Sequence, residues 1–134
     1  MNVEKEILTR YRNIAIVGAS PDPERHSNKV FAYLRDNNYW VVPVNPTVDK
    51  VLERQSYPDL ASVPGPIEVV NVFRASDKVM PIVDEAIAVG AKVLWLQEGV
   101  INEAAAAKAR EAGLTVIMDR CIAKAHAAMA GKKH

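Results

Sequence analysis

Short runs of consecutive hydrophobic residues recur along this chain and alternate with segments in which hydrophobic residues return every three or four positions. The continuous runs are typical of strands buried on both faces of a parallel sheet. The spaced positions are typical of amphipathic helices. We therefore predict five strands, at residues 14–17, 39–44, 67–72, 92–96 and 114–118.

Polar and glycine residues mark where the helices between these strands begin and end. Ser27 and Ser76 are the expected N-caps of the second and third helices, and Asn102 is expected to begin the fourth. Gly90 and Gly113 stand where a helix C-terminal glycine belongs. The predicted helices span about residues 3–11, 27–36, 76–90, 102–113 and 122–130.

Strands that alternate with helices indicate a parallel sheet with helices on both faces. We predict an α/β fold in one domain over residues 1–134, a Rossmann-like, doubly wound five-stranded sheet with strand order 3-2-1-4-5. Pro43 fits its strand poorly, because proline cannot donate to a sheet ladder, although it is tolerated near the end of a strand. Residues 47–66 break the alternation, and we expect a helical turn at 48–54.

Composition narrows the class of protein. The chain has 134 residues, 49% of them hydrophobic, which is enough for one folded core. Its net charge of +1 gives no overall field suited to nucleic acid, and no hydrophobic run is long enough to cross a membrane. The single cysteine, Cys121, excludes an internal disulfide or a CxxC zinc site. Without a signal peptide pattern at the N-terminus, we expect a cytoplasmic protein.

Gly18 ends the first predicted strand and allows a sharp turn before the next helix. A helix N-terminus placed there directs unpaired N–H groups at the carboxyl edge of the sheet, where anions bind. The dinucleotide motif GxGxxG is absent, because Ser20 and Pro23 replace its second and third glycines. Asn45 stands where NAD enzymes usually carry an acidic residue, and no P-loop sequence occurs. A standard NAD or FAD site is therefore disfavoured.

Two pairs of basic residues lie at the same predicted edge of the sheet. Arg25 and Lys29 flank the start of one helix, and Arg74 and Lys78 flank the start of another. Like charges at this spacing repel by roughly 0.2–0.5 kcal/mol, and cations near a helix N-terminus oppose the helix dipole. A bound polyanion would turn this repulsion into attraction. The alternative is that all four side chains point into solvent.

Several other residues admit two interpretations. Ser20 either donates to a phosphate or caps a turn with Asp22. Arg74 either clamps a phosphate or ribose, with Phe73 over an adenine, or is a solvated loop residue. Glu98 is expected to hydrogen-bond a ligand or to cap the helix that begins near Asn102, rather than to act as a general base.

No catalytic or metal site stands out. Cys121 and His126 are five residues apart on one predicted helix and do not share a face well, so we interpret Cys121 as a small buried residue. His26 and the terminal residue His134 add no further candidate.

Five ordered motifs resemble those of the small stand-alone CoA-binding proteins, which are similar to the N-terminal CoA-binding domain of succinyl-CoA synthetase α subunits. The resemblance extends from about Ile7 to His126. It implies coenzyme A as the ligand and the same Rossmann-like fold. The motifs occupy residues 18–27, 42–46, 70–74, 95–100 and 118–122.

The resemblance also implies roles for particular residues. The turn of Gly18, Ala19 and Ser20, together with Arg25, would contact the CoA phosphates, and Asn45 with Pro46 would form one wall. Val72, Phe73 and Arg74 would border the adenine, and Leu96, Gln97 and Glu98 would lie near the ribose or the pantetheine arm. The synthetases carry a lysine after Asn-Pro where this chain has Thr47, so Lys50 is a candidate substitute.

The likeness carries over ligand binding but not catalysis, because no residue matches the phosphorylated histidine of the synthetases. We therefore expect a protein that binds CoA or an acyl-CoA and has no evident catalytic machinery of its own. The alternatives are a subunit of an acyl-CoA synthetase or transferase complex and an NAD(P)-binding redox regulator. The first of these requires a protein partner that the sequence does not identify, and neither nucleic acid nor a membrane is expected as a partner.

Overall fold

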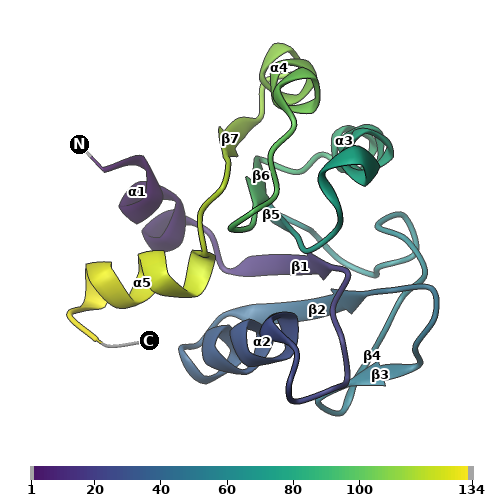
Figure 1. Ribbon diagram of the computed structural model, residues 1–134, viewed down its shortest axis with the longest axis vertical. Helices are drawn as coiled ribbons and strands as arrows, with labels where there is room; N and C mark the ends of the chain where they lie inside the picture. The colour runs from purple at the N-terminus through teal and green to yellow at the C-terminus, as the bar shows by residue number, and fades with distance from the viewer. Residues whose placement is uncertain (1, 133–134) are drawn as a thin grey trace.

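The computed structural model describes residues 2–132 and contains one five-stranded parallel sheet (Figure 1). The strands of this sheet are β1 (Asn13–Val17), β2 (Trp40–Val44), β5 (Val69–Val72), β6 (Val93–Leu96) and β7 (Thr115–Ile117). The helices are α1 (Val3–Arg10), α2 (His26–Asp36), α3 (Val79–Ala88), α4 (Glu103–Glu111) and α5 (Ile122–Ala130), and a short 3-10 turn, η1 (Ser76–Lys78), precedes α3. Within residues 2–132, none of these helices combines the length and the hydrophobicity that crossing a membrane requires.

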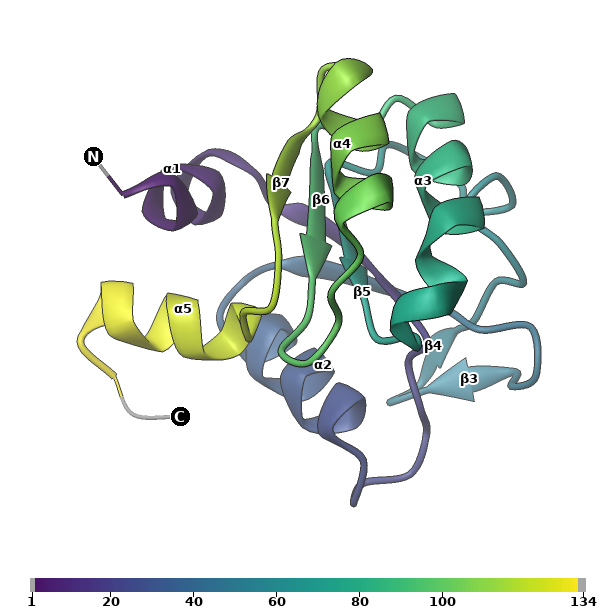
Figure 2. The same ribbon diagram turned by 45° about the horizontal axis from the view of Figure 1, so that its top comes forward.

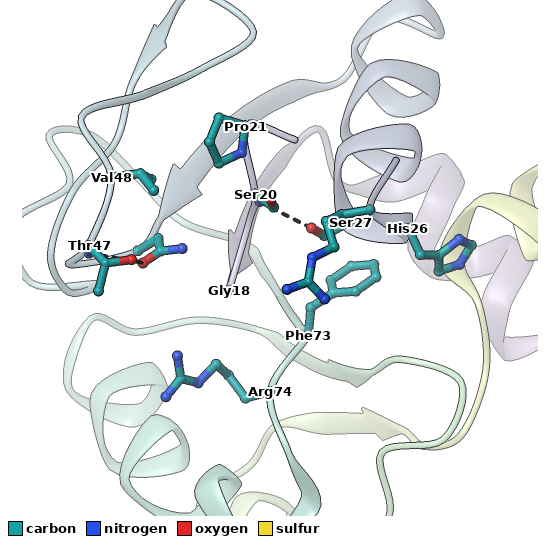
Figure 3. Close-up of a pocket in the computed structure, with 11 residues that line it drawn as sticks. Gly18, Ser20, Pro21, His26, Ser27, Thr47, Val48, Phe73 and Arg74 are labelled. Atoms are coloured by element: carbon teal, nitrogen blue, oxygen red, sulfur yellow. Dashed lines mark hydrogen bonds between the residues drawn. The ribbon is translucent and has the colours of Figure 1, made fainter. Parts of the chain in front are cut away.

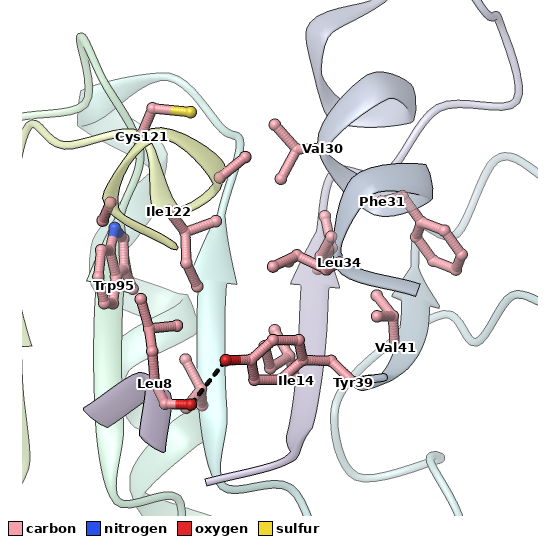
Figure 4. Close-up of a cluster of buried hydrophobic side chains, with 14 of the residues drawn as sticks. Leu8, Ile14, Val30, Phe31, Leu34, Tyr39, Val41, Trp95, Cys121 and Ile122 are labelled. Atoms are coloured by element: carbon pink, nitrogen blue, oxygen red, sulfur yellow. Dashed lines mark hydrogen bonds between the residues drawn. The ribbon is translucent and has the colours of Figure 1, made fainter. Parts of the chain in front are cut away.

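Helices cover both faces of the sheet, as the sequence predicted. Ile14 and Ile16 of β1 belong to a core cluster that includes residues of α1, α2 and α5. Ala15 and Val17, which point to the opposite face, belong to a second cluster with residues of α3 and α4. Figure 2 shows α3 and α4 side by side, away from α1 and α5, and Figure 4 shows the first cluster between the sheet and its helices. The predicted doubly wound Rossmann-like class is confirmed.

The predicted strand order 3-2-1-4-5 is wrong. The observed order is β2-β1-β5-β6-β7, so the third predicted strand lies between the first and the fourth. Pro43 explains why β2 lies at an edge. Its carbonyl points away from β1 and accepts a hydrogen bond from the Tyr57 N–H, 3.1 Å away. The proline nitrogen, which has no hydrogen to donate, faces the same outer side, where no ladder bond is lost.

The predicted helical turn at 48–54 is also wrong, because a small antiparallel hairpin occupies that segment. It consists of β3 (Lys50–Val51) and β4 (Arg54–Gln55). The two residues between these strands, Leu52 and Glu53, both have positive φ angles, of 47° and 69°. That conformation is typical of a tight hairpin turn, but the usual glycine or asparagine signal is missing here.

The hairpin covers the open edge of β2. Arg54 donates from Nη1 to the carbonyl of Val41 at 2.9 Å, and its guanidinium lies 4.4 Å from the centre of the Trp40 ring. Downstream of the hairpin, Tyr57 accepts a hydrogen bond from the Asn45 N–H as well as donating to Pro43. The edge carbonyls of β2 are thus satisfied within the chain, which protects the edge from pairing with another strand.

The helix boundaries agree partly with the sequence. Asn102 caps α4 as predicted, accepting a hydrogen bond from the Ala105 N–H at 3.0 Å. Gly90 and Gly113 follow α3 and α4 with positive φ angles, which confirms their terminating role.

The two predicted serine caps are wrong. Ser27 lies inside α2, where its hydroxyl accepts a hydrogen bond from the Ser20 N–H. Ser76 begins η1 and accepts from the Ile101 N–H. Both hydroxyls accept hydrogen bonds from neighbouring loops and do not cap the helices. A local capping pattern does not reveal such contacts between distant residues.

His126 on α5 contacts two tyrosines of the first core cluster. Its Nδ1 lies 2.8 Å from the Tyr33 hydroxyl, and its ring meets the rings of Tyr33 and Tyr39 edge to face. Burial, followed by the nearby charges of Lys132 and Arg12, lowers the pKa of His126 below its ordinary value of 6.5. The folded state therefore favours the neutral imidazole.

This cluster predicts a dependence of stability on pH. Because the pKa of His126 is lower in the folded state, the unfolded chain takes up a proton first as the pH falls below about 6.5. The free energy of unfolding should be unaffected by this group above that pH and should fall below it. Chemical denaturation from about pH 7 to about pH 5 should give a shallower loss for His126→Gln than for the wild type. Parallel curves for the two proteins would contradict the assignment.

Candidate functional site

An open cleft of about 440 Å³ lies beyond the carboxyl ends of β1 and β5. The chain leaves β1 toward α2 and the sheet edge at β2, whereas it leaves β5 toward α3 and β6, so the direction of winding reverses between these two strands. Ligands of doubly wound sheets bind at such a reversal. Figure 3 shows the cleft, which is lined by Gly18, Ser20, Pro21, Arg25, His26, Ser27, Asn45, Thr47, Val48, Phe73 and Arg74.

Gly18 lets the turns after β1 and β5 approach each other at the base of the cleft. Its φ angle is +90°, and a Cβ atom built on it would lie 2.4 Å from the Phe73 carbonyl oxygen. Its N–H donates to the carbonyl of Val44 at 2.8 Å, which also ties the turn to β2. Only glycine meets both requirements, the left-handed backbone and the contact with a neighbouring backbone.

Ser20 has a structural role within the loop that follows. Its N–H donates to the Ser27 hydroxyl at 3.1 Å, and its own hydroxyl accepts from the Asp22 N–H at 3.1 Å. The side-chain amide of Asn28 donates to the Ser20 carbonyl at 2.9 Å. Of the two interpretations of Ser20, the turn with Asp22 is present. Its side chain also lines the cleft, and contact with a phosphate stays a prediction.

Asn45 fixes the opposite wall. Its Nδ2 donates to the Ala19 carbonyl at 2.9 Å, and its Oδ1 accepts from both the N–H and the hydroxyl of Thr47, at 3.0 and 2.8 Å. The side chain therefore joins the loops after β1 and β2 and fixes their spacing. Asn45 lines the cleft, and both of its side-chain polar atoms already make hydrogen bonds within the protein, although Nδ2 has a second N–H to donate.

The predicted basic residues gather at this end of the sheet without acidic partners. Arg25 and Arg74 line the cleft, and all four cations, with Lys29 and Lys78, are exposed. Within residues 2–132, no carboxylate lies within 4.0 Å of any of these four charges. The first turn of α2 contains no acidic residue and has no side-chain cap. Uncompensated positive charge beside an uncapped helix N-terminus is suited to a polyanion.

A second cavity, of about 260 Å³, adjoins the cleft across Gly18 and Arg74. Pro46 and Lys78, which the sequence assigned to the ligand site, line this cavity instead of the main cleft. Because Arg74 lines both hollows, its guanidinium is placed to serve a ligand that extends from one to the other.

Other predicted ligand residues do not line the cleft. Ala19, Val72 and Leu96 are fully buried in the core, and Gln97 is buried beneath the cleft. Lys29 is exposed on α2 and does not line it.

Glu98 is exposed and pairs with Lys124 at 3.1 Å, and since Asn102 caps α4, Glu98 does not. Its contact with a ligand stays a prediction. Because the winding reverses between β1 and β5, the loop after β6, which carries Gln97 and Glu98, lies one strand further away than the predicted strand order implied.

The sequence interpretation missed His26. It lines the cleft, its ring meets Phe73 at 5.9 Å between centroids, and its Nε2 lies 3.6 Å from the Sγ of Cys121. Cys121 and His126 were not expected to act together, and the His126 ring contacts Tyr33 and Tyr39 instead. The sequence offered one signal for the contact between His26 and Cys121. Residues 26 and 121 both stand at the N-terminal ends of helices at the carboxyl edge of the sheet. His134 lies outside the described residues.

The residues present fit the phosphates of a nucleotide. Two cleft arginines without acidic partners and the N-terminus of α2 face one opening, and the Gly18 turn borders it. Among residues 2–132, no three or more histidine, cysteine or acidic side chains cluster in a way that could hold a metal ion. The fold and this cleft define a Rossmann-like α/β domain with a basic cleft where its winding reverses.

Comparison with known proteins narrows that class. A family model described as the CoA binding domain matches residues 12–127. The uncharacterized protein YneT of Bacillus subtilis (strain 168) is 44% identical over 123 residues, which make up 92% of this chain and 91% of that protein. The chain therefore belongs to the CoA-binding domain family.

Solved structures agree with this assignment. A hypothetical protein from Pyrococcus horikoshii OT3 matches with a TM-score of 0.94 and 46% identity, over 96% of this chain and 91% of that one. A dinucleotide-forming acetyl-coenzyme A synthetase 1 from Ca. Korarchaeum cryptofilum matches with a TM-score of 0.73 and 26% identity. That match covers 85% of this chain and 27% of the synthetase.

Two glycine substitutions test the geometry at the base of the cleft. Gly18→Ala and Gly65→Ala both place a side chain at a positive φ angle, but only the first meets a neighbouring backbone atom. We expect Gly18→Ala to lower the free energy of unfolding by about 1–3 kcal/mol more than Gly65→Ala, because the Phe73 carbonyl must move. Urea denaturation of both variants measures the difference, and equal losses would show that the two turns do not press together.

Proposed function

We propose that this protein binds coenzyme A or an acyl-CoA in the cleft between the Gly18 turn and the Arg74 loop. The observation that carries the proposal is the set of arginines without acidic partners around that opening, in a member of the CoA-binding domain family. CoA carries a pyrophosphate and a separate 3′-phosphate, so it suits scattered cations better than a simple dinucleotide does.

In this proposal, different residues of the cleft contact different parts of the ligand. Arg25 and the N-terminus of α2 attract phosphate on one side of the cleft, and Arg74 attracts it on the other. Phe73 is half-buried and offers a ring face or edge to the adenine. Pro46 and Lys78 extend the site into the adjoining cavity. The buried residues Ala19, Val72 and Leu96 then act through their backbone or by supporting the loops.

The site binds but, in this proposal, has no catalytic machinery of its own. The polar atoms of Ser20 and Asn45 hold loops together, and Glu98 pairs with Lys124. The function that follows is to carry, buffer or sense CoA or an acyl-CoA.

Titration calorimetry with CoA tests the phosphate contact. Arg25→Ala should weaken binding by about 1.5–3 kcal/mol, which corresponds to about tenfold to about a hundredfold in the dissociation constant. Arg110→Ala is the matched control, because Arg110 is exposed on α4, on the other face of the sheet. This variant should bind CoA with the affinity of the wild type. Equal affinity of Arg25→Ala and the wild type would remove Arg25 from the site.

Thermal shifts with CoA, acetyl-CoA, NAD and NADP at one concentration separate the ligand classes, because each stabilises the fold according to its concentration over its dissociation constant. A larger shift with either CoA species supports the proposal. A larger shift with NAD or NADP would instead favour a redox regulator.

A second candidate function is that of a subunit in an acyl-CoA synthetase or transferase complex. The observation that favours it is the likeness to a segment of the Korarchaeum synthetase, a chain of which this one matches 27%. In that case, a pull-down from the native host should recover a second protein, and the pair should form acyl-CoA from CoA and a carboxylic acid.

A further inference from the structure

Two side chains that are 95 positions apart in the sequence meet at one wall of the cleft. Cys121 is the N-cap of α5 and is fully buried, and its Sγ lies 3.6 Å from His26 Nε2. His26 is the first residue of α2, is exposed and lines the cleft. The imidazole therefore lies between the thiol and the opening.

The surroundings of His26 define which of its nitrogens accepts a proton. The side-chain amide nitrogen of Gln97 lies 3.3 Å from His26 Nε2, while the Gln97 oxygen accepts hydrogen bonds from Asn71 Nδ2 and the Ile122 N–H. Since the Gln97 nitrogen can only donate, the neutral ring must accept at Nε2. Cys121 Sγ lies 3.6 Å from the same nitrogen, so the thiol can replace the Gln97 amide as the donor to this single lone pair and pass its proton to His26.

Asn71, Gln97 and His26 form a row of hydrogen-bonded side chains, which contains one acceptor with no donor among residues 2–132. Asn71 is fully buried at the centre of the sheet, and its Nδ2 donates to Gln97 and to the Trp95 carbonyl. Its Oδ1 accepts no hydrogen bond from residues 2–132. A buried oxygen of this kind is normally satisfied, so the side chains from Asn71 through Gln97 to His26 have capacity for one more donor, such as a buried water molecule.

We propose that Cys121 and His26 make the cleft a site of thiol–disulfide exchange with the disulfide of CoA, so that the protein forms a mixed disulfide with CoA. This inference rests on the proposed function, because the nucleotide half of the ligand is what brings its sulfur to this wall. Cys121 is the only cysteine in the sequence, so it has no internal partner and any disulfide it forms joins it to another molecule.

The exchange balances without a further oxidant. His26 Nε2 takes the proton from Cys121, and the resulting thiolate attacks one sulfur of the CoA disulfide. The bond between Cys121 and that sulfur forms while the original disulfide bond breaks. The displaced CoA leaves as a thiolate and takes up the proton from His26. The products are one mixed disulfide and one CoA thiol.

Access to the sulfur depends on His26. Cys121 is covered in this conformation, but His26 is exposed and can change rotamer on a fast timescale, which would uncover the thiol beside it. The reaction should therefore be slow for reagents without affinity for the cleft and faster for a disulfide held there.

Intact-mass spectrometry tests the proposal on the full chain. The reduced protein is incubated with CoA disulfide or, separately, with glutathione disulfide at the same concentration. We expect one CoA adduct per chain, formed more than tenfold faster than the glutathione adduct, removed by a reducing agent and absent from Cys121→Ser. Thermal shifts with CoA show whether Cys121→Ser still folds and binds, with Cys121→Ala as the second variant should the buried serine hydroxyl prevent folding.

A variant of the base separates proton transfer from mere packing. His26→Gln should slow formation of the adduct by about a hundredfold at neutral pH, and the gap should narrow at alkaline pH, where water removes the thiol proton unaided. A rate ratio to the wild type that does not change with pH would overturn the role of His26 as base.

The remaining outcomes are distinct. Stabilisation by CoA without any adduct, or equal rates with CoA and glutathione disulfides, would overturn the exchange site and leave the proposed function standing. No stabilisation by CoA and no adduct would reject both.

Discussion

The pairing of β1 with a strand on each side, continued past its last residue, is the constraint on which the rest of the structure depends. The Gly18 N–H donates to Val44 on one side, and the Phe73 N–H donates to Val17 on the other. Three loops are thereby drawn to one point, where a side chain on Gly18 would collide with the Phe73 backbone. Backbone groups therefore fix the base of the cleft, and the side chains of Arg25 and Arg74 are not needed to hold these loops together.

Much of the fold could be predicted because it is encoded locally. The run from Ile14 to Val17, the Asn102 cap and the glycine after α3 each reflect contacts within a few residues, and each was interpreted correctly. Strand order is a global property. The sequence did contain a signal for it, since Pro43 is disfavoured in an interior strand, but its position near the end of β2 allowed either interpretation.

The rest could not be predicted because it depends on contacts far apart in the sequence. Leu52 and Glu53 form a tight turn without the residues that usually mark one, because the hairpin is held by Arg54 on the edge of β2. The contact of His26 with Cys121 depends on α2 and α5 lying on the same face, which no local pattern specifies. The candidate cleft lies at the predicted edge of the sheet, between the Gly18 turn and the Arg74 loop, but the observed strand order places the loop after β6 one strand further away than expected.

The charges at this edge of the sheet suit the ligand that we propose. Among residues 2–132, four cations away from the cleft form ion pairs, among them Lys108 with Asp84 and Arg120 with Glu4, whereas none of the four basic residues at this edge does. Acidic and basic residues are nearly equal in number, 16 and 17, so partners for the cleft arginines were available in the composition. Concentrating unpaired positive charge at an uncapped helix N-terminus costs stability in the free protein. A bound polyanion would remove that cost, so under the proposed function the charges that weaken the empty fold would strengthen the complex and couple stability to affinity.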